Sequence, residues 1–484
     1  MPPPKPAKKQ HLALTGSALI LLSASLAACT VGPAYEKPGL PTSTALPANF
    51  KALDGWKVAT PGDLLDRGDW WTLLDDPQLD ALIGRVNVSN QTIAAAEANY
   101  RQARALVREQ RASLFPTIDL SGSATRSGGS SSASSTSSSS NGSRYQVGLG
   151  ASWEPDLWGR IRNGVTGAKA GEQASAADLA GAKLSMQGEL AVNYLGLRQT
   201  DAELALVGRT VEGYQRSLTI TQNRYNAAIA PKSDVLQAQT QLANAQADLE
   251  SLRQTRATYE NAIATLVGEP ASAFKLAADP AWSAQLPDVP TGVPSELLER
   301  RPDIAAAERR VAAANADIGV ARAAFFPTIG LSASGNSSSS SLGNLFSASA
   351  NTWSLGLSVA QSLFDAGARK AQVEQARAAY DASVADYRLT VLTAFEDVEN
   401  QLTAVQVLER RYALLKTSAD AADQTEQMLL NQYKAGQVAY TDVVAAQASA
   451  LSARRSLLTA TVARQTTAVA LIQALGGGWK AEGL

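Results

Sequence analysis

Two regions of the chain alternate apolar residues with small polar ones, which is the period-2 pattern of a β-strand. Each region contains two such segments, which flank a Ser-rich loop at 127–143 in the first region and at 335–350 in the second. The alternation predicts one β-hairpin over 114–155 and a second over 325–362. The apolar positions are Ile118, Leu120, Gly122, Ala124, Tyr145, Val147, Leu149, Ala151 and Trp153 in the first hairpin, and Ile329, Leu331, Ala333, Trp353, Leu355, Leu357 and Val359 in the second.

These segments suit a membrane, because each is about ten residues long with one apolar face and aromatic ends, as a transmembrane β-strand requires. The alternative is a hairpin that packs on a soluble core and turns its polar face to water. Four strands cannot close a barrel, and an open sheet edge is not stable in lipid. Strands that span the membrane would therefore require several chains to share one barrel, and three chains would supply twelve strands.

Helical segments surround both hairpins. A helix rich in Ala, Gln and Arg precedes each hairpin, at about 88–112 and 303–323, and a much longer helix follows, at about 160–229 and 367–435. At 1.5 Å per residue, ~65 helical residues extend roughly 100 Å. Their apolar residues are small and sparse, which indicates the walls of a hollow assembly. A solid antiparallel coiled coil is the alternative.

Each long helix is predicted to end in a sharp turn and to return as a shorter helix. The turns lie at 227–231 and 435–439. Pro231 suits the first turn of the returning helix, and Gly436 suits a helix C-cap. The sequence therefore predicts two long helical hairpins.

The second half of the chain repeats the first. The sequences Ile-Ala-Ala-Ala-Glu at 93–97 and Phe-Pro-Thr-Ile at 115–118 both recur 211 residues later, whereas Tyr225 and Asp234 recur 208 residues later. The change of three residues falls within the Ser-rich loops, where insertions are tolerated. The predicted organisation is a signal segment at 1–28, an N-terminal segment at 29–87, a first repeat at 88–268 with its helical hairpin at 160–268, a linker at 269–302, a second repeat at 303–476 with its helical hairpin at 367–476, and a tail at 477–484.

The N-terminus has the pattern of a targeting signal. Three lysines precede an apolar run at 12–28 that is too short for a comfortable membrane span. The run ends in Leu-Ala-Ala before Cys29, the only cysteine of the chain. This resembles a bacterial lipoprotein signal, and it implies cleavage before Cys29 and acylation of its thiol and new amine. An ordinary secretory signal with an incidental cysteine is the alternative. Thr30, in the position where an aspartate would indicate inner-membrane retention, favours the outer membrane.

Charge and composition exclude several classes of function. The 484 residues include 43 Lys+Arg and 44 Asp+Glu, a net charge of −1, so the chain lacks the basic surface that a nucleic-acid partner requires. The only histidine, His11, lies in the signal segment. We therefore expect no His-based or Cys-based catalysis, no zinc site of nitrogen and sulfur ligands, and no disulfide. No paired-carboxylate motif suggests an enzyme, and we expect no cofactor beyond the covalent lipid on Cys29.

Several short motifs along the chain match one family. They are Cys29–Pro38 (CTVGPAYEKP), Trp70-Trp71, Asp76-Pro77, Leu79 through Leu82, Glu299–Asp303 (ERRPD) and the two Phe-Pro-Thr-Ile blocks. Together they resemble the outer-membrane efflux proteins of the TolC and OprM type over essentially the whole chain. The resemblance implies an α+β fold in a homotrimer: a twelve-stranded β-barrel in the outer membrane, four strands per chain, continues into a long periplasmic α-helical barrel. Segment 29–87 would belong to the periplasmic, equatorial part.

The same resemblance implies a function in transport. Members of the family are exit ducts of tripartite efflux pumps, which pass small molecules such as drugs to the exterior. The implied partners are a periplasmic adaptor protein, an inner-membrane transporter of the RND type and outer-membrane lipid. The duct of a type I protein secretion system and a non-transport envelope spacer are the alternatives, and the sequence does not identify the substrate.

The resemblance makes the two helical turns the functional end of the molecule, because in the family these tips form the periplasmic aperture and contact the adaptor. The implied adaptor-contact residues are Tyr225, Ala228, Tyr433, Gly436 and Gln437. Asp442, and Asp234 by the repeat, would lie at the aperture, where three copies form a ring of carboxylates that attracts cations. The alternative role is an aspartate early in a helix, which the helix dipole favours.

Two positions near the tip depart from the family pattern. Val438 replaces an arginine that locks the closed state in some members, and Ala445 replaces a second lumen aspartate. These two replacements predict that apolar contacts contribute more to the closure of this aperture than they do in the family members that carry the arginine and the second aspartate.

Overall fold

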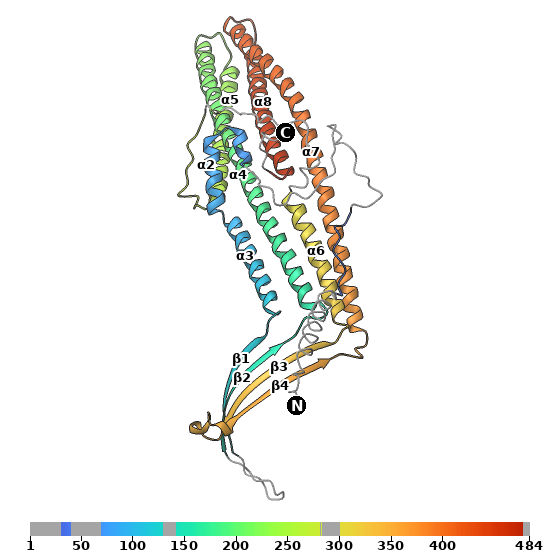
Figure 1. Cartoon of the computed structure of the whole chain (residues 1–484). Helices are drawn as coiled ribbons and strands as arrows, with labels where there is room; N and C mark the ends of the chain where they lie inside the picture. Colours follow the sequence, from blue (N-terminus) through green and yellow to red (C-terminus); the bar gives the residue numbers. More distant parts are fainter. Residues whose placement is uncertain (1–30, 40–68, 129–141, 281, 283–300, 478–484) are drawn as a thin grey trace, which may run out of the picture. The chain divides into compact units, whose positions relative to one another are not determined.

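The structure, a computed structural model, describes residues 31–39, 69–128, 142–280, 282 and 301–477 (Figure 1). The signal segment and Cys29 therefore lie outside the described residues. The chain divides into two compact units, and each unit takes segments from both repeats. We call them the strand unit (Met1–Gly39, Arg101–Ala174 and Ala307–Tyr387) and the helical unit (Leu40–Tyr100, Ser175–Ala306 and Arg388–Leu484).

Four antiparallel strands form the sheet of the strand unit, side by side in the order β1-β2-β3-β4 (Figure 1). They are β1 (Thr117–Ser127), β2 (Gly142–Trp153), β3 (Thr328–Ser339) and β4 (Asn351–Ala360). Each strand lies where the alternation of apolar and polar residues predicts one. β3 continues to Ser339, beyond the predicted start of the second Ser-rich loop at 335, and two short 3₁₀ turns, Leu342–Asn344 and Ala348–Ala350, complete the connection to β4.

The strand register aligns the apolar residues on one face of the sheet. Leu120 lies opposite Leu149, and Leu331 lies opposite both Trp153 and Leu357. The other face carries mainly Ser, Gly and Thr, and it includes the hydroxyl contact of 2.8 Å between Thr117 and Ser152. Most of the large apolar side chains of the first face are exposed in the single chain: Ile118, Leu120, Leu149, Trp153, Leu331, Trp353, Leu355, Leu357 and Val359.

Six helices form three pairs that are related by the repeat. They are α3 (Gln91–Ala112) and α6 (Pro302–Ala323), α4 (Arg160–Asn226) and α7 (Ala368–Lys434), and α5 (Lys232–Leu266) and α8 (Tyr440–Ala474). The members of each pair have equal lengths of 22, 67 and 35 residues. Among the described residues, we find no helix with both the length and the apolar content needed to cross a membrane.

One further helix, α2 (Pro77–Ser89), is not predicted from the sequence pattern; it follows the 3₁₀ turn η1 (Trp70–Leu74). Its start has clear signals, because Pro77 occupies the first position and Asp76 accepts hydrogen bonds from two backbone amides at 3.0 and 3.2 Å. The helix predicted at about 88–112 begins at Gln91, because Asn90 caps it by accepting hydrogen bonds from the backbone amides of the second and third residues that follow.

Asn90 and Arg301 stand 211 residues apart and have equivalent roles in the two repeats. Asn90 Nδ2 donates to the Leu266 carbonyl at 2.8 Å, at the end of α5. Arg301 Nη1 donates to the Ala474 carbonyl at 3.0 Å, at the end of α8, and its Nη2 forms an ion pair with Asp397 at 3.2 Å. An arginine of the ERRPD motif therefore joins the start of α6 to the end of the returning helix.

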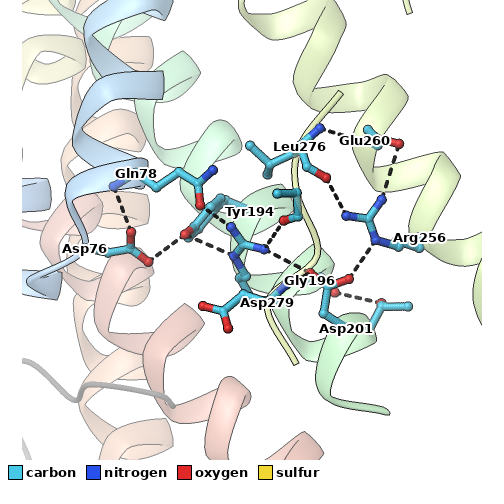
Figure 2. Close-up of polar contacts among 12 residues, drawn as sticks. Asp76, Gln78, Tyr194, Gly196, Asp201, Arg256, Glu260, Leu276 and Asp279 are labelled. Atoms are coloured by element: carbon cyan, nitrogen blue, oxygen red, sulfur yellow. Dashed lines mark hydrogen bonds and ion pairs between the residues drawn. The ribbon is translucent and has the colours of Figure 1, made fainter. Parts of the chain in front are cut away.

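A buried polar network joins α4, α5 and the segment after α5 in the helical unit (Figure 2). Arg198 on α4 donates to Asp201 Oδ2 and to the Ala277 carbonyl, both at 2.9 Å. Arg256 on α5 donates to Asp201 Oδ1 and to the Leu276 carbonyl, both at 2.7 Å. Arg198 and Asp201 are buried, so removal of Asp201 would leave Arg198 as an uncompensated buried charge, whereas Asp201 would keep its ion pair with Arg256 if Arg198 were removed.

The same network reaches the start of α2 (Figure 2). The Tyr194 hydroxyl donates to Asp76 Oδ2 at 2.6 Å and accepts from Arg198 Nε at 3.1 Å. Arg198 also donates to the side-chain oxygen of Gln78. Burial, and then the hydrogen bond to Asp76, raise the pKa of Tyr194, so its hydroxyl remains a donor. The network thus connects α2 with both helices of the first helical hairpin.

Candidate functional site: the two helical turns

The α4–α5 turn (227–231) and the α7–α8 turn (435–439) both lie in the helical unit and share one backbone motif. In the first turn the Ile229 amide donates to the Arg224 carbonyl and the Ala228 amide donates to the Tyr225 carbonyl, both at 2.9 Å. The second turn repeats both bonds 208 residues later at the same length. This is the Schellman motif, which satisfies the last carbonyls of a helix when one residue adopts the left-handed conformation.

The two turns differ in that left-handed residue. Gly436 adopts φ +76°, which glycine reaches without steric cost. Ala228 adopts φ 58°, and an L-residue with a Cβ pays roughly 1–2 kcal/mol for this conformation. The first turn therefore holds a strained residue where the second does not.

Side chains from three helices meet beside the turns and form what we call the tip cluster: Ala238 on α5, Tyr433 on α7, and Tyr440 and Val443 on α8. Both tyrosines are buried, and their ring centroids lie 5.1 Å apart at an interplanar angle of 53°. Aromatic pairs of this kind contribute about 0.5–1.5 kcal/mol beyond their burial. The tip cluster therefore holds the start of α8 against the end of α7 and against α5.

Arg224, in the last turn of α4, connects the two turns. Its Nη1 donates to the Tyr433 carbonyl at 3.1 Å, and its guanidinium carbon lies 4.8 Å from the centroid of the Tyr433 ring. A cation is also favoured at a helix C-terminus. The repeat partner of Arg224 is the uncharged Gln432. Within the described turns, the first turn therefore contacts the second through an arginine, and no arginine makes the reverse contact.

Both tyrosines of the tip cluster remain neutral at physiological pH. Burial raises the pKa of Tyr440 to about 12, and burial followed by the charge of Asp234 raises the pKa of Tyr433. The Tyr433 hydroxyl is buried and has no hydrogen-bond partner within the described part of the chain. An unpaired buried hydroxyl costs about 1–3 kcal/mol, so the packing of the ring has to offset this cost.

The predicted carboxylates lie at equivalent places, since Asp234 and Asp442 are the third residues of α5 and α8. Asp442 is exposed and Asp234 is partly buried. Their backbone amides donate to the carbonyls of Pro231 and Ala439, both at 3.2 Å. This position agrees with a role at an aperture and equally with stabilisation by the helix dipole. Within the described ranges, no group of three His, Cys, Asp or Glu residues could hold a metal ion.

The predicted adaptor-contact residues divide into two groups. Tyr225, Ala228, Gly436 and Gln437 are exposed, whereas the side chain of Tyr433 belongs to the tip cluster. Tyr225 and Tyr433 are partners in the repeat, yet they are 41% and 3% exposed, respectively.

Sequence reasoning missed Arg224 and Tyr440. The available signal was the difference between the two turns, because Arg224 stands opposite Gln432 in the repeat and Tyr440 stands opposite Lys232. At these two positions a break in the repeat marks a side chain that connects the two halves.

Comparison with known proteins identifies the family. The family model of the outer membrane efflux protein matches residues 82–269 and 293–477. The chain is 31% identical to outer membrane protein OprJ of Pseudomonas aeruginosa over 470 residues, 96% of each chain. It is 31% identical to the probable efflux pump outer membrane protein TtgC of Pseudomonas putida over 479 residues, 97% of this chain and 96% of the relative. The solved structure of the outer-membrane channel OprN is similar with a TM-score of 0.81 and 31% identity, over 93% of this chain and 100% of that one. The chain therefore belongs to the outer membrane efflux protein family and is an outer-membrane protein.

Proposed function

We propose that three copies of the chain form the exit duct of a tripartite efflux pump, which passively conducts small molecules from the periplasm to the exterior. In this assembly the three sheets close into one twelve-stranded barrel, and the helical hairpins form a periplasmic tunnel. The protein acts as a conduit and not as an enzyme, because an inner-membrane transporter, of the RND type by resemblance, supplies the energy.

The observation that carries this proposal is the sheet of the strand unit. One face exposes large apolar side chains such as Leu120, Trp353 and Leu357, and the other carries small polar ones. An exposed apolar surface of this extent requires a partner or lipid, and alternation of this kind is typical of strands that separate lipid from a polar lumen. β1 and β4 are the edge strands of the described sheet, and edges in lipid must be paired.

The turns are the proposed contact surface for a periplasmic adaptor. Tyr225, Ala228, Gly436 and Gln437 present exposed backbone and side chains there, while the tip cluster supports them from behind. Val438 packs against the tip cluster, which supports a closure that depends on apolar contacts where related proteins carry an arginine.

We assign Asp442 to the lumen near the aperture, where three-fold symmetry would create a ring of carboxylates that attracts cations. Asp442→Ala is expected to weaken block by divalent cations and to raise open-channel leak in planar bilayers. Asp234→Ala tests the second predicted aperture carboxylate, which is partly buried where Asp442 is exposed. Unchanged conductance and unchanged block in Asp442→Ala would refute the lumen assignment.

Cys29 is the proposed lipid attachment site. Acylation would add membrane affinity through buried methylene groups, although the barrel would retain the protein in the membrane by itself. The intact mass of the mature wild-type chain, compared with Cys29→Ser, tests this assignment: an unacylated wild-type chain would remove it.

A photo-crosslinking amino acid at Gln437 tests the function in cells, with the same probe at the exposed Gln254 on α5 as the matched control. Specific capture at Gln437 of the adaptor of a proton-driven drug transporter would support the exit duct of an efflux pump. Capture of the adaptor of an ATP-driven secretion system would change the cargo to protein. Failure to capture any envelope partner from well-expressed protein would favour the envelope spacer.

A further inference from the structure

The contact between two neighbouring strands continues beyond the sheet in the strand unit. Trp158, in the connection from β2 to α4, stacks on Phe326, two residues before β3 begins, with ring centroids 4.9 Å apart and an interplanar angle of 26°. The Trp158 indole Nε1 also donates to the Pro327 carbonyl at 2.7 Å. An aromatic joint therefore fixes the exit from β2 against the entry to β3.

The internal repeat predicts a second joint of this kind for the two edge strands. Phe115 precedes β1 as Phe326 precedes β3. The residue that corresponds to Trp158 at the offset of 208 is Ala366, and the large apolar side chains nearest to it in the connection from β4 to α7 are Leu363 and Phe364. The side chains of Phe115, Leu363 and Phe364 are 68%, 91% and 88% exposed. The joint from the first repeat to the second is thus assembled within the chain, while both halves of the joint from the second repeat to the first are exposed.

Two further contacts show that the bases of the two β-hairpins are equivalent in the repeat. Trp153 Nε1 at the end of β2 donates to the Leu114 carbonyl at 3.0 Å, and Gln361 Nε2 after β4 donates to the Phe325 carbonyl at 3.4 Å. The donors are 208 residues apart and the acceptors 211, which are the offsets of the repeat.

A capping aspartate also recurs in the connections to α4 and α7. Asp156 accepts from the Arg162 backbone amide at 2.7 Å, and Asp365 accepts from the Arg369 backbone amide at 3.2 Å. Trp158 follows its aspartate whereas Phe364 precedes its own, so the two loops differ in detail although each carries an aromatic side chain beside the capping aspartate.

We propose that Leu363 and Phe364 of one copy pack against Phe115 of a neighbouring copy, and that this joint accompanies the pairing of β4 with the neighbour's β1. The inference rests on the proposed homotrimer and adds the residues and register of its interface. The occupant is a second copy of this chain, because the same chain already fills the equivalent site once, with Trp158 on Phe326. Association of this kind also removes the two open sheet edges.

The repeat specifies the register of the new strand pair. In the β2–β3 pair, Trp153 lies opposite Leu331 and Gly150 lies opposite Ser334. Moving the β2 residues forward by 208 and the β3 residues back by 211 sets Gln361 opposite Leu120 and Ser358 opposite Ser123. This register keeps the apolar residues of both strands on one face of the sheet, which a slip by one residue would not do.

Paired cysteines test the register in the full-length protein in its own membrane. Ser123→Cys with Ser358→Cys is expected to form a disulfide between copies and to yield covalent trimers, because directly opposed residues meet the geometry of the bond. The matched control is Ser121→Cys with Ser358→Cys, which is offset by two residues, and the wild type with Cys29 alone sets the background. Crosslinking in the control in place of the tested pair would overturn the register.

A photo-crosslinker at Phe364 tests the joint itself, with the exposed Phe346 in the β3–β4 connection as the matched site. Capture at Phe364 of a peptide that contains Phe115 from another copy supports the joint. Capture of lipid alone would overturn it and make Leu363 and Phe364 an interfacial membrane anchor. If the cysteine pair closes while Phe364 captures only lipid, the proposed trimer stands and the joint fails. If neither cysteine pair crosslinks and the protein runs as a monomer after gentle extraction, the proposed trimer itself fails.

Discussion

The two repeats have the same backbone elements but different side-chain chemistry. α4 and α7 have 67 residues each, and α5 and α8 have 35 each. Yet Asp201 on α4 is completely buried between two arginines, whereas its repeat partner Glu409 on α7 is exposed. The difference teaches that repeated turn and cap signals determine where the helices begin and end, while the side chains between them adapt to what covers each repeat.

The largest expected effect in this comparison is at Asp201. Asp201→Ala leaves the buried Arg198 without its carboxylate and removes one of the two carboxylates that contact Arg256, so we expect a loss of about 3–5 kcal/mol of stability. Thermal unfolding of the purified protein, followed by helical circular dichroism, measures the loss as a lower midpoint.

Glu409→Ala is the matched control, because it removes an acidic side chain from the equivalent place on α7. A change at an exposed site is expected to stay within about 0.5 kcal/mol. Equal shifts of the midpoint in the two variants would show that the network in Figure 2 is not a main source of stability in the helical unit.

The two turns permit a finer comparison, because Arg224 and Gln432 occupy equivalent positions. Arg224→Ala removes a hydrogen bond and a cation–π contact to Tyr433, and we expect a loss of about 1–2 kcal/mol together with a more mobile turn. Gln432→Ala should have little effect. Amide hydrogen exchange in residues 224–240 and 430–445 is the measurement, and equally protected turns in Arg224→Ala would contradict the assigned role.

Much of the fold could be predicted from the sequence, because its signals are local. Strict alternation predicts the four strands, and proline-free Ala- and Gln-rich segments predict α4 and α7. α2 escaped prediction although Asp76 and Pro77 mark its start, since its thirteen residues are short compared with the other helices. The resemblance implies a strand part and a helical part that each draw on both repeats, but the boundaries of the two units, which fall within helices such as α4 and α7, were not predictable from local patterns.

The candidate site was predictable in position but not in chemistry. Gly436 and Pro231 mark the turns, and the repeat relates Asp234 to Asp442. The tip cluster depends on which faces of α5, α7 and α8 meet, and no local pattern contains that information. Tyr433 illustrates this limit, because its partner Tyr225 has the same local sequence position and a different degree of burial.

The smallest and sharpest test concerns the left-handed residue of each turn. Gly436→Ala adds a Cβ to a residue at φ +76° and is expected to destabilise the second turn by about 1 kcal/mol. Ala228→Gly relieves the same clash at φ 58°, but glycine also loses more backbone entropy on folding. We therefore expect a net stabilisation of somewhat less than 1 kcal/mol.

The two variants are informative as a pair because their expected changes in stability have opposite signs at equivalent positions. If Ala228 were unstrained, Ala228→Gly would only cost backbone entropy, so it would be destabilising as Gly436→Ala is, and both variants would shift in one direction. Left-handed strain at Ala228 shifts the two variants apart. The amides of Ile229 and Gln437 report the two turns directly, because each donates the hydrogen bond of its Schellman motif that spans five residues, at 2.9 Å. Faster exchange at Gln437 in Gly436→Ala and slower exchange at Ile229 in Ala228→Gly would establish that the first turn stores strain. Shifts of the same sign would mean that the turn relaxes around Ala228 and that its strain is not a property of the folded protein.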